Sequence, residues 1–177
     1  TFGEVPKPGP LTDTDAVLLD SVAGSFVEIG ALIEQARLKA AIAETMRISS
    51  LANQYLADQA PWALVKTDRD RAATVLYVAL HCVDSLKTLF APFLPHTSQI
   101  VHELLGYDGY LAGPIESVTI TEDDGSTHEV LTGDYDSWVG SWTPSELSAG
   151  QTLREPRPLF RKLPPETVDE ELARLGL

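Results

Sequence analysis

The stretch ANQYLADQAPWALVK, residues 52–66, decides how this chain folds. Pro61 ends a helix there, because the residue before a proline disfavours the helical conformation. Trp62 then lies at the corner between two helices. A large flat ring in that place is either a hydrophobic plug or a platform for an unpaired base, where stacking contributes ~1–3 kcal/mol per base. Basic residues that could meet phosphates follow it: Lys66, Arg69 and Arg71.

Apolar residues on both sides of this stretch recur at helical spacing. They predict helices at about residues 13–33, 36–59, 68–90 and 96–105. In the first, Val22, Phe26 and Ile29 lie on one face, and Thr12 or Thr14 is placed to cap the helix. We therefore predict a helical bundle over residues 1–105.

The pattern changes after Gly106, which is expected to end the last of these helices. Residues 117–131, SVTITEDDGSTHEVL, predict a β-hairpin whose turn lies at residues 123–126. Residues 133–165, with Trp138, Trp142 and five prolines, look irregular or extended, and a short helix is expected to end near Leu175. The predicted fold class is all-α, with a hairpin, a proline-rich tail and a terminal helix in residues 106–177.

The net charge is −13, from 26 acidic and 13 basic residues, which argues against a general nucleic-acid binder. Most of this charge lies late in the chain. Residues 101–177 hold 15 acids and 5 bases, whereas residues 37–71 hold 4 acids and 6 bases. Exposed charges more than ~8–10 Å apart are largely screened. The acidic total is therefore compatible with local recognition of a few bases near Trp62.

The sequence contains no G-x-S-x-G, P-loop or G-x-G-x-x-G motif. Its four histidines include no pair at the i,i+3 or i,i+4 spacing that places two ligands on one helix face. Cys82 is the single cysteine and lies on an apolar stripe, so we expect a core residue. The first ten residues do not resemble a signal peptide, and no run reaches the eighteen or so apolar residues of a membrane helix. We expect no catalytic residue, no metal site, no membrane or DNA partner, and a cytoplasmic location.

The chain resembles the anticodon-binding domain of bacterial methionyl-tRNA synthetases, which are class I aminoacyl-tRNA synthetases. The resemblance rests first on Asn53-x-Tyr55 and on Gln59-Ala60-Pro61-Trp62 with Lys66. It continues through ATVLYVALHCVDSLKTLFAPFLPHTSQIVHELLG at residues 73–106, LGYDG at 105–109 and PLFRKL at 158–163. It covers nearly the whole chain.

The resemblance implies a mainly helical anticodon-binding bundle in which Trp62 stacks on the first anticodon base, a cytosine. Pro61 would then place the backbone beside that base. Asn53 and Tyr55 match the same segment: Asn53 is expected with Trp62 and Pro61 among the anticodon-binding residues, and for both Asn53 and Tyr55 we expect a role in holding the corner. The implied partners are the anticodon stem-loop of a methionine tRNA and the catalytic domain of a parent enzyme.

The chain also departs from the family's pattern. The catalytic signatures of the family do not occur in it, so ATP and magnesium are expected in the parent enzyme and no cofactor in this fragment. The chain starts near the end of the family's usual first helix, which is therefore expected to be missing along with two residues that read anticodon bases. This departure and the acidic charge favour an alternative, a structural or interaction module that no longer binds RNA.

Overall fold

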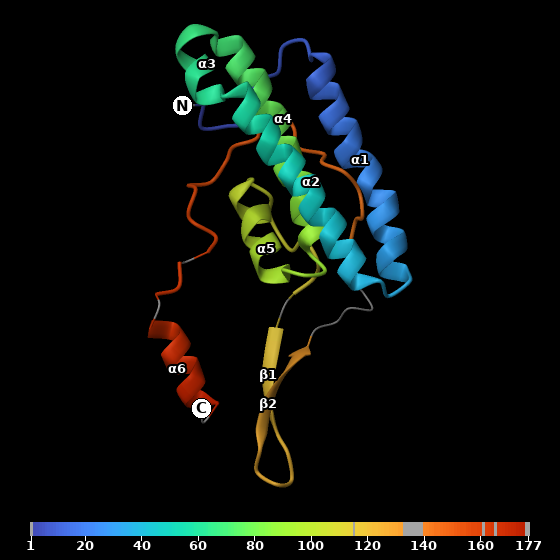
Figure 1. Cartoon of the computed structure of the whole chain (residues 1–177), viewed down its shortest axis with the longest axis vertical. Helices are drawn as coiled ribbons and strands as arrows, with labels where there is room; N and C mark the ends of the chain where they lie inside the picture. Colours follow the sequence, from blue (N-terminus) through green and yellow to red (C-terminus); the bar gives the residue numbers. More distant parts are fainter. Residues whose placement is uncertain (1, 115, 133–139, 161, 165, 176–177) are drawn as a thin grey trace.

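The computed structural model describes residues 2–114, 116–132, 140–160, 162–164 and 166–175. It is a mainly α-helical bundle with a two-stranded antiparallel hairpin (Figure 1), which confirms the predicted fold class. The elements run in the order α1 (Asp13–Glu34), α2 (Leu38–Gln59), α3 (Pro61–Thr67), α4 (Arg69–Phe90), α5 (Pro95–Leu104), β1 (Glu116–Thr121), β2 (Thr127–Thr132) and α6 (Glu166–Arg174). Trp138 and Arg161, which belong to predicted features of the tail, lie outside the described residues.

Helix α1 begins at the predicted cap. The Thr12 hydroxyl accepts a bond from the Asp15 backbone N–H, and the Asp15 carboxylate accepts one from the Thr12 N–H at 2.9 Å. This reciprocal capping box satisfies two N–H groups that have no partner within the helix. Val22, Phe26 and Ile29 on the predicted face are all buried. Burial of that stripe is what fixes α1 against the rest of the bundle.

Helix α3 was not predicted. The sequence places Trp62 at a corner, and the structure builds that corner as a separate helix of seven residues between α2 and α4. A helix this short shows less than two full turns of hydrophobic periodicity, so no repeat reveals it. Asp68 then begins α4, because its carboxylate accepts a bond from the Arg71 backbone N–H at 2.9 Å.

The main core lies between α1, α2 and α4, where Ile29, Ile48, Val75 and Leu89 have essentially no exposed surface. Cys82 lies in this core as predicted, and burial raises the pKa of its thiol to about 12. Burying such side chains is the main favourable contribution to folding, at roughly 25 cal/mol per Å² of apolar surface.

A second cluster joins the chain's start to the segment after the hairpin. Val5, Leu105 and Leu147 pack together, and Val5 donates a backbone bond to Gln151 at 2.8 Å. Further along this segment, Trp142 packs edge-on against Phe26 of α1 and donates its indole N–H to the Phe26 carbonyl at 2.9 Å. Residues 140–155, called the strap below, therefore pack across the bundle.

The hairpin and α6 extend away from the bundle (Figure 1). Val118 pairs with Val130 in the hairpin register, and Gly125 takes a positive φ of 83° in the predicted turn. No residue of α6 is buried among those described. The hairpin lies at the end of the bundle opposite to α3.

Helices α1 and α4 are each long and apolar enough, by length and mean hydropathy, to cross a membrane, although neither contains an unbroken run of eighteen apolar residues. Both helices contribute buried residues to the main core. Core helices of soluble proteins satisfy the same criteria, and most of the apolar window of α4 is buried in the bundle, whereas most of that of α1 is not.

Candidate functional site

The corner that carries Trp62 is formed by three consecutive residues. Ala60 takes the left-handed conformation, with φ 42° and ψ 57°, because it cannot continue α2 before a proline. Pro61 is the first residue of α3, where the missing N–H has no consequence and the fixed φ suits a helix. Pro61 is buried, so α3 starts from a fixed point.

Trp62 projects from the first turn of α3 and is 64% exposed. This exposure contradicts the interpretation of the ring as a hydrophobic plug. Lys66 lies four residues later in the same helix and is also exposed. Residues four apart share a helix face. An aromatic ring and a cation are therefore displayed together on one side of α3.

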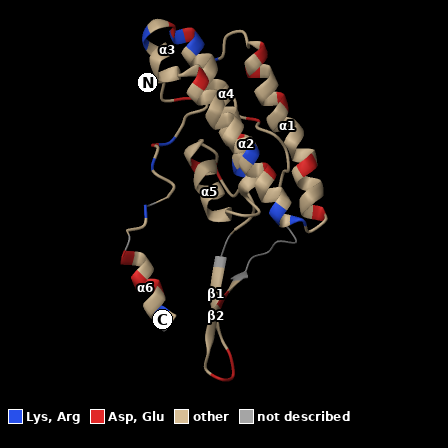
Figure 2. Ribbon diagram, in the orientation of Figure 1, with Lys and Arg blue, Asp and Glu red and all other residues tan. Residues whose placement is uncertain are grey.

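Arg69 begins α4 and is exposed. Its guanidinium carbon lies 5.1 Å from the centroid of the Phe2 ring, a distance typical of a cation–π contact. Such a contact orients the side chain and leaves most of the guanidinium donors available. Figure 2 shows basic residues at the α3 end of the bundle, mixed with acidic ones, whereas the hairpin tip is acidic. The site thus has little net charge.

Asn53 and Tyr55, paired in the sequence analysis, lie in different surroundings. Asn53 is exposed on α2 and makes no side-chain hydrogen bond to another described residue, so no contact supports the expected role in holding the corner. Tyr55 is buried and donates its hydroxyl to Asp15 at 2.7 Å, a bond between residues 40 positions apart. Tyr55 therefore has the structural role that was expected of both.

Arg71 does not lie free for a phosphate as the sequence suggested. Its Nη1 and Nη2 atoms donate to the two carboxylate oxygens of Asp15 at 2.5 and 2.8 Å, and Nη2 also donates to Gln59 Oε1 at 2.6 Å. The side chain is 20% exposed, and that of Asp15 is fully buried. These bonds occupy the guanidinium inside the protein, so we give Arg71 a structural role in place of the predicted phosphate contact.

The protonation state of this cluster follows from its bonds. Burial would raise the pKa of Asp15, but the bonds from Arg71, Thr12 and Tyr55 outweigh burial and hold that pKa well below its usual range. Burial and the bond to Asp15 raise the pKa of Tyr55. The Asp15 carboxylate raises the pKa of Arg71. Near neutral pH the cluster is a buried ion pair with a neutral tyrosine, which is a structural arrangement.

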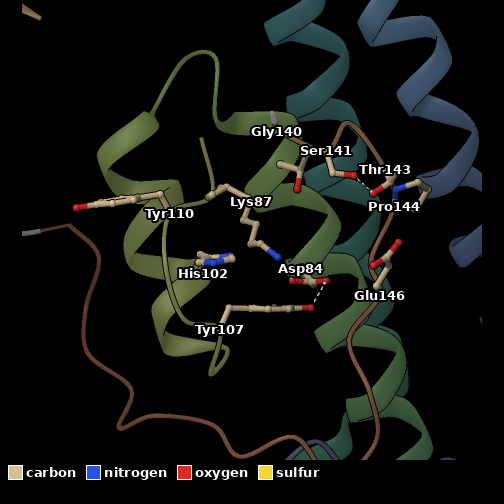
Figure 3. A pocket seen from close by; sticks show the side chains of 12 residues that line it. Asp84, Lys87, His102, Tyr107, Tyr110, Gly140, Ser141, Thr143, Pro144 and Glu146 are labelled. Atoms are coloured by element: carbon tan, nitrogen blue, oxygen red, sulfur yellow. Dashed lines mark hydrogen bonds and ion pairs between the residues drawn. The ribbon is translucent and has the colours of Figure 1, made fainter. Parts of the chain in front are cut away.

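A second polar cluster lines a cavity of about 270 Å³ between α4, α5 and the strap (Figure 3). Lys87 and Asp84 form a buried ion pair, and the Tyr107 hydroxyl donates to Asp84 at 3.1 Å. The His102 ring stacks on Tyr107, with centroids 4.7 Å apart. Lys87 Nζ lies 4.1 Å from the centroid of the Tyr107 ring. Lys87, Asp84 and Tyr107 thus pair their polar groups with one another, and the cluster contains none of the predicted site residues.

His102 is the exception within that cluster. Neither of its ring nitrogens makes a well-formed hydrogen bond to a described residue. Burial lowers the pKa of His102, the nearby Lys87 ammonium lowers it further, and the Asp108 backbone partly opposes both effects. A neutral imidazole is therefore favoured at this position.

Sequence reasoning missed Asp15 and Gln59. Asp15 lies 56 positions from Arg71, so no local sequence pattern joins the two residues. The available signal was the spacing of Tyr55 and Gln59, which are four apart and so share a face at the end of α2.

Comparison with known proteins gives a consistent picture. Residues 5–116 match the family described as "Anticodon binding domain of methionyl tRNA ligase". Methionine–tRNA ligases of Chloroflexus aurantiacus and Thermobifida fusca are 56% and 44% identical, each over 98% of this chain. The chain spans 29% and 30% of their lengths. The apo crystal structure of Mycobacterium tuberculosis methionyl-tRNA synthetase shares the fold, with a TM-score of 0.69 and 24% identity over 92% of this chain and 28% of that one.

Proposed function

Because this chain belongs to the family of anticodon-binding domains of methionyl-tRNA ligases, we propose that it recognises the anticodon loop of a methionine tRNA. Trp62 is the platform on which one anticodon base stacks, and the family resemblance assigns that base as the first, a cytosine. The observation that carries the proposal is the 64% exposure of the Trp62 ring on a short helix anchored by a buried proline. Large exposed aromatic rings are the usual platforms for unpaired bases.

The residues around Trp62 have complementary roles in this proposal. Pro61 sets the backbone that the base approaches. Lys66 and Arg69 contact loop phosphates, since both are exposed and close in sequence to the ring. The Asn53 amide, which bonds to no other described side chain or backbone group, is available for hydrogen bonds to the RNA. Two phosphate contacts provide little backbone attraction, so selectivity comes mainly from the loop bases.

In the proposed parent enzyme, this domain positions the tRNA and a separate catalytic domain joins methionine to it. Among the described residues, no group of three or more His, Cys, Asp or Glu side chains is arranged to hold a metal ion. The described residues therefore present no built metal site, and we assign ATP and magnesium to the catalytic domain and derive no step through them. We also propose a cytoplasmic location for this parent enzyme of protein biosynthesis.

The test is Trp62→Ala in the full-length ligase that carries this domain. Loss of one stacking platform of ~1–3 kcal/mol should lower kcat/KM for the tRNA roughly five- to 150-fold. Methionine-dependent ATP–pyrophosphate exchange should be unchanged, because that step does not need the anticodon. Tyr110→Ala is the matched control, since Tyr110 is also an exposed aromatic residue, at 59%, but lies beside the strap cavity.

Lys66→Ala gives an independent check on the phosphate contacts. Removing one phosphate contact should reduce the slope of log affinity against log salt by about 0.7 for a single-stranded loop. An unchanged kcat/KM in Trp62→Ala, with the fold intact, would instead favour the alternative suggested by the net charge of −13, a structural or interaction module.

A further inference from the structure

We propose that Arg71 is a positioning residue that presents Trp62 by clamping together the two ends of the segment that contains α3. This inference rests on the proposed function, since it concerns how the stacking platform is held. Gln59 is the last residue of α2, and Arg71 is the third residue of α4. The bond from Arg71 Nη2 to Gln59 Oε1, at 2.6 Å, therefore closes a loop that contains the whole of α3.

Arg71 is itself held on several sides, which makes it a rigid anchor. Its planar guanidinium binds the Asp15 carboxylate through two parallel bonds of 2.5 and 2.8 Å. Asp15 is fixed in turn by the Tyr55 hydroxyl and the Thr12 backbone N–H. Only an arginine can bind the carboxylate through two parallel bonds and also donate to Gln59, because its guanidinium holds several donors in a fixed plane. A lysine ammonium is a point charge on a flexible chain and lacks this geometry.

Helix α3 depends on its two ends because it has only seven residues. Isolated helices shorter than ~12–15 residues are marginal in water. Pro61 is buried, Leu64 and Val65 are half-buried, and the helix packs along α4, the helix that carries Arg71. Trp62 lies three residues after Gln59, so the position of the backbone that carries its ring depends on where the end of α2 is held. The clamp thus links a buried ion pair to an exposed recognition side chain.

The decisive variant is Gln59→Met in the full-length ligase, because it removes the Gln59 bond and keeps the Asp15–Arg71 pair that stabilises the fold. Gln54→Met is the matched control, since Gln54 lies on the same helix and bonds only Asp58 at 2.7 Å among the described residues. We expect Gln59→Met to raise the KM for the tRNA about fivefold, the scale of one net hydrogen bond. Its kcat and its melting temperature should stay close to those of the control.

Amide hydrogen exchange gives the second measurement. Residues 60–67 should exchange faster in Gln59→Met than in Gln54→Met, whereas α1 should not differ. Equal KM values and equal exchange in the two variants would overturn the clamp. Trp62→Ala is measured alongside: if it raises the KM and Gln59→Met does not, the clamp fails and the proposed function stands. If Trp62→Ala leaves the KM unchanged, both are overturned.

Discussion

Replacing Arg71 with methionine should reduce the stability of the fold sharply. The substitution removes two bonds to a fully buried carboxylate and one bond to Gln59. Breaking a buried ion pair from one side costs about 3–5 kcal/mol. We expect the lower end, about 3 kcal/mol, because the Arg71 side chain is 20% exposed and Tyr55 still donates to Asp15. In a chain of this size that corresponds to a fall in melting temperature of roughly 6–12 °C.

Thermal and urea unfolding of the purified chain measure this loss, and Arg47→Met is the matched control. Arg47 also pairs with a carboxylate, that of Glu44 at 2.6 Å, but its side chain is 55% exposed. Exposed pairs contribute about 0–1 kcal/mol. The Arg71 variant should therefore lose several times more stability than the Arg47 variant. Similar losses in the two variants would refute the assignment of a buried structural pair.

The same loss should depend on pH in a defined direction. The pKa of Asp15 is lowered in the folded chain, so its contribution is present above the unfolded value of about 3.9 and is lost as pH falls through the folded value. Removing Arg71 raises the folded pKa of Asp15 and so removes part of that contribution. The stability difference between wild type and Arg71→Met should be full at pH 7 and shrink below about pH 4. An equal difference at pH 7 and pH 3 would contradict this reasoning.

Other variants test the strap and the histidine beside it. Gly24→Ala should stabilise the chain by about 0.5–1 kcal/mol, because it adds helix propensity in open space. Gly30→Ala should not give this stabilisation, because the added Cβ would lie 3.0 Å from Trp142 Nε1. If its melting temperature equals or exceeds that of Gly24→Ala, the described position of Trp142 is contradicted. Burial lowers the pKa of His102 in the folded chain, so below about pH 6.5 the unfolded chain binds more protons than the folded chain. The free energy of unfolding should therefore fall as the pH drops below that value. His102→Gln should flatten this decline between pH 7 and pH 5 in urea titrations, and an identical slope would refute it.

The sequence predicted the elements that depend on local patterns. The spacing of Val22, Phe26 and Ile29 identified one long helix, because a buried stripe must recur with the helical period. Pro61 marked the end of another, because proline acts on its immediate neighbour. The turn around Gly125 followed for a similar local reason. The boundary errors were small: α2 starts two residues later than predicted, and α5 starts one residue earlier.

The candidate site was only partly predictable. Trp62, Lys66 and Arg69 could be chosen from the sequence, but whether the ring was exposed or buried could not, because burial depends on what packs against the corner. Arg71 looked equivalent to Arg69 in the sequence, since both follow Trp62 closely. Only the fold brings Asp15 from 56 positions away to bind one of these arginines and leave the other exposed.

The sequence by itself determined that this chain is a helical bundle with an aromatic corner and a mildly basic neighbourhood, because helical period, proline geometry and local charge are short-range properties. Tertiary structure decided which side chains at the corner are available to a partner. It turned Trp62 outward and drew Arg71 inward, because a buried carboxylate must be paired whereas an aromatic ring at a helix end need not be covered.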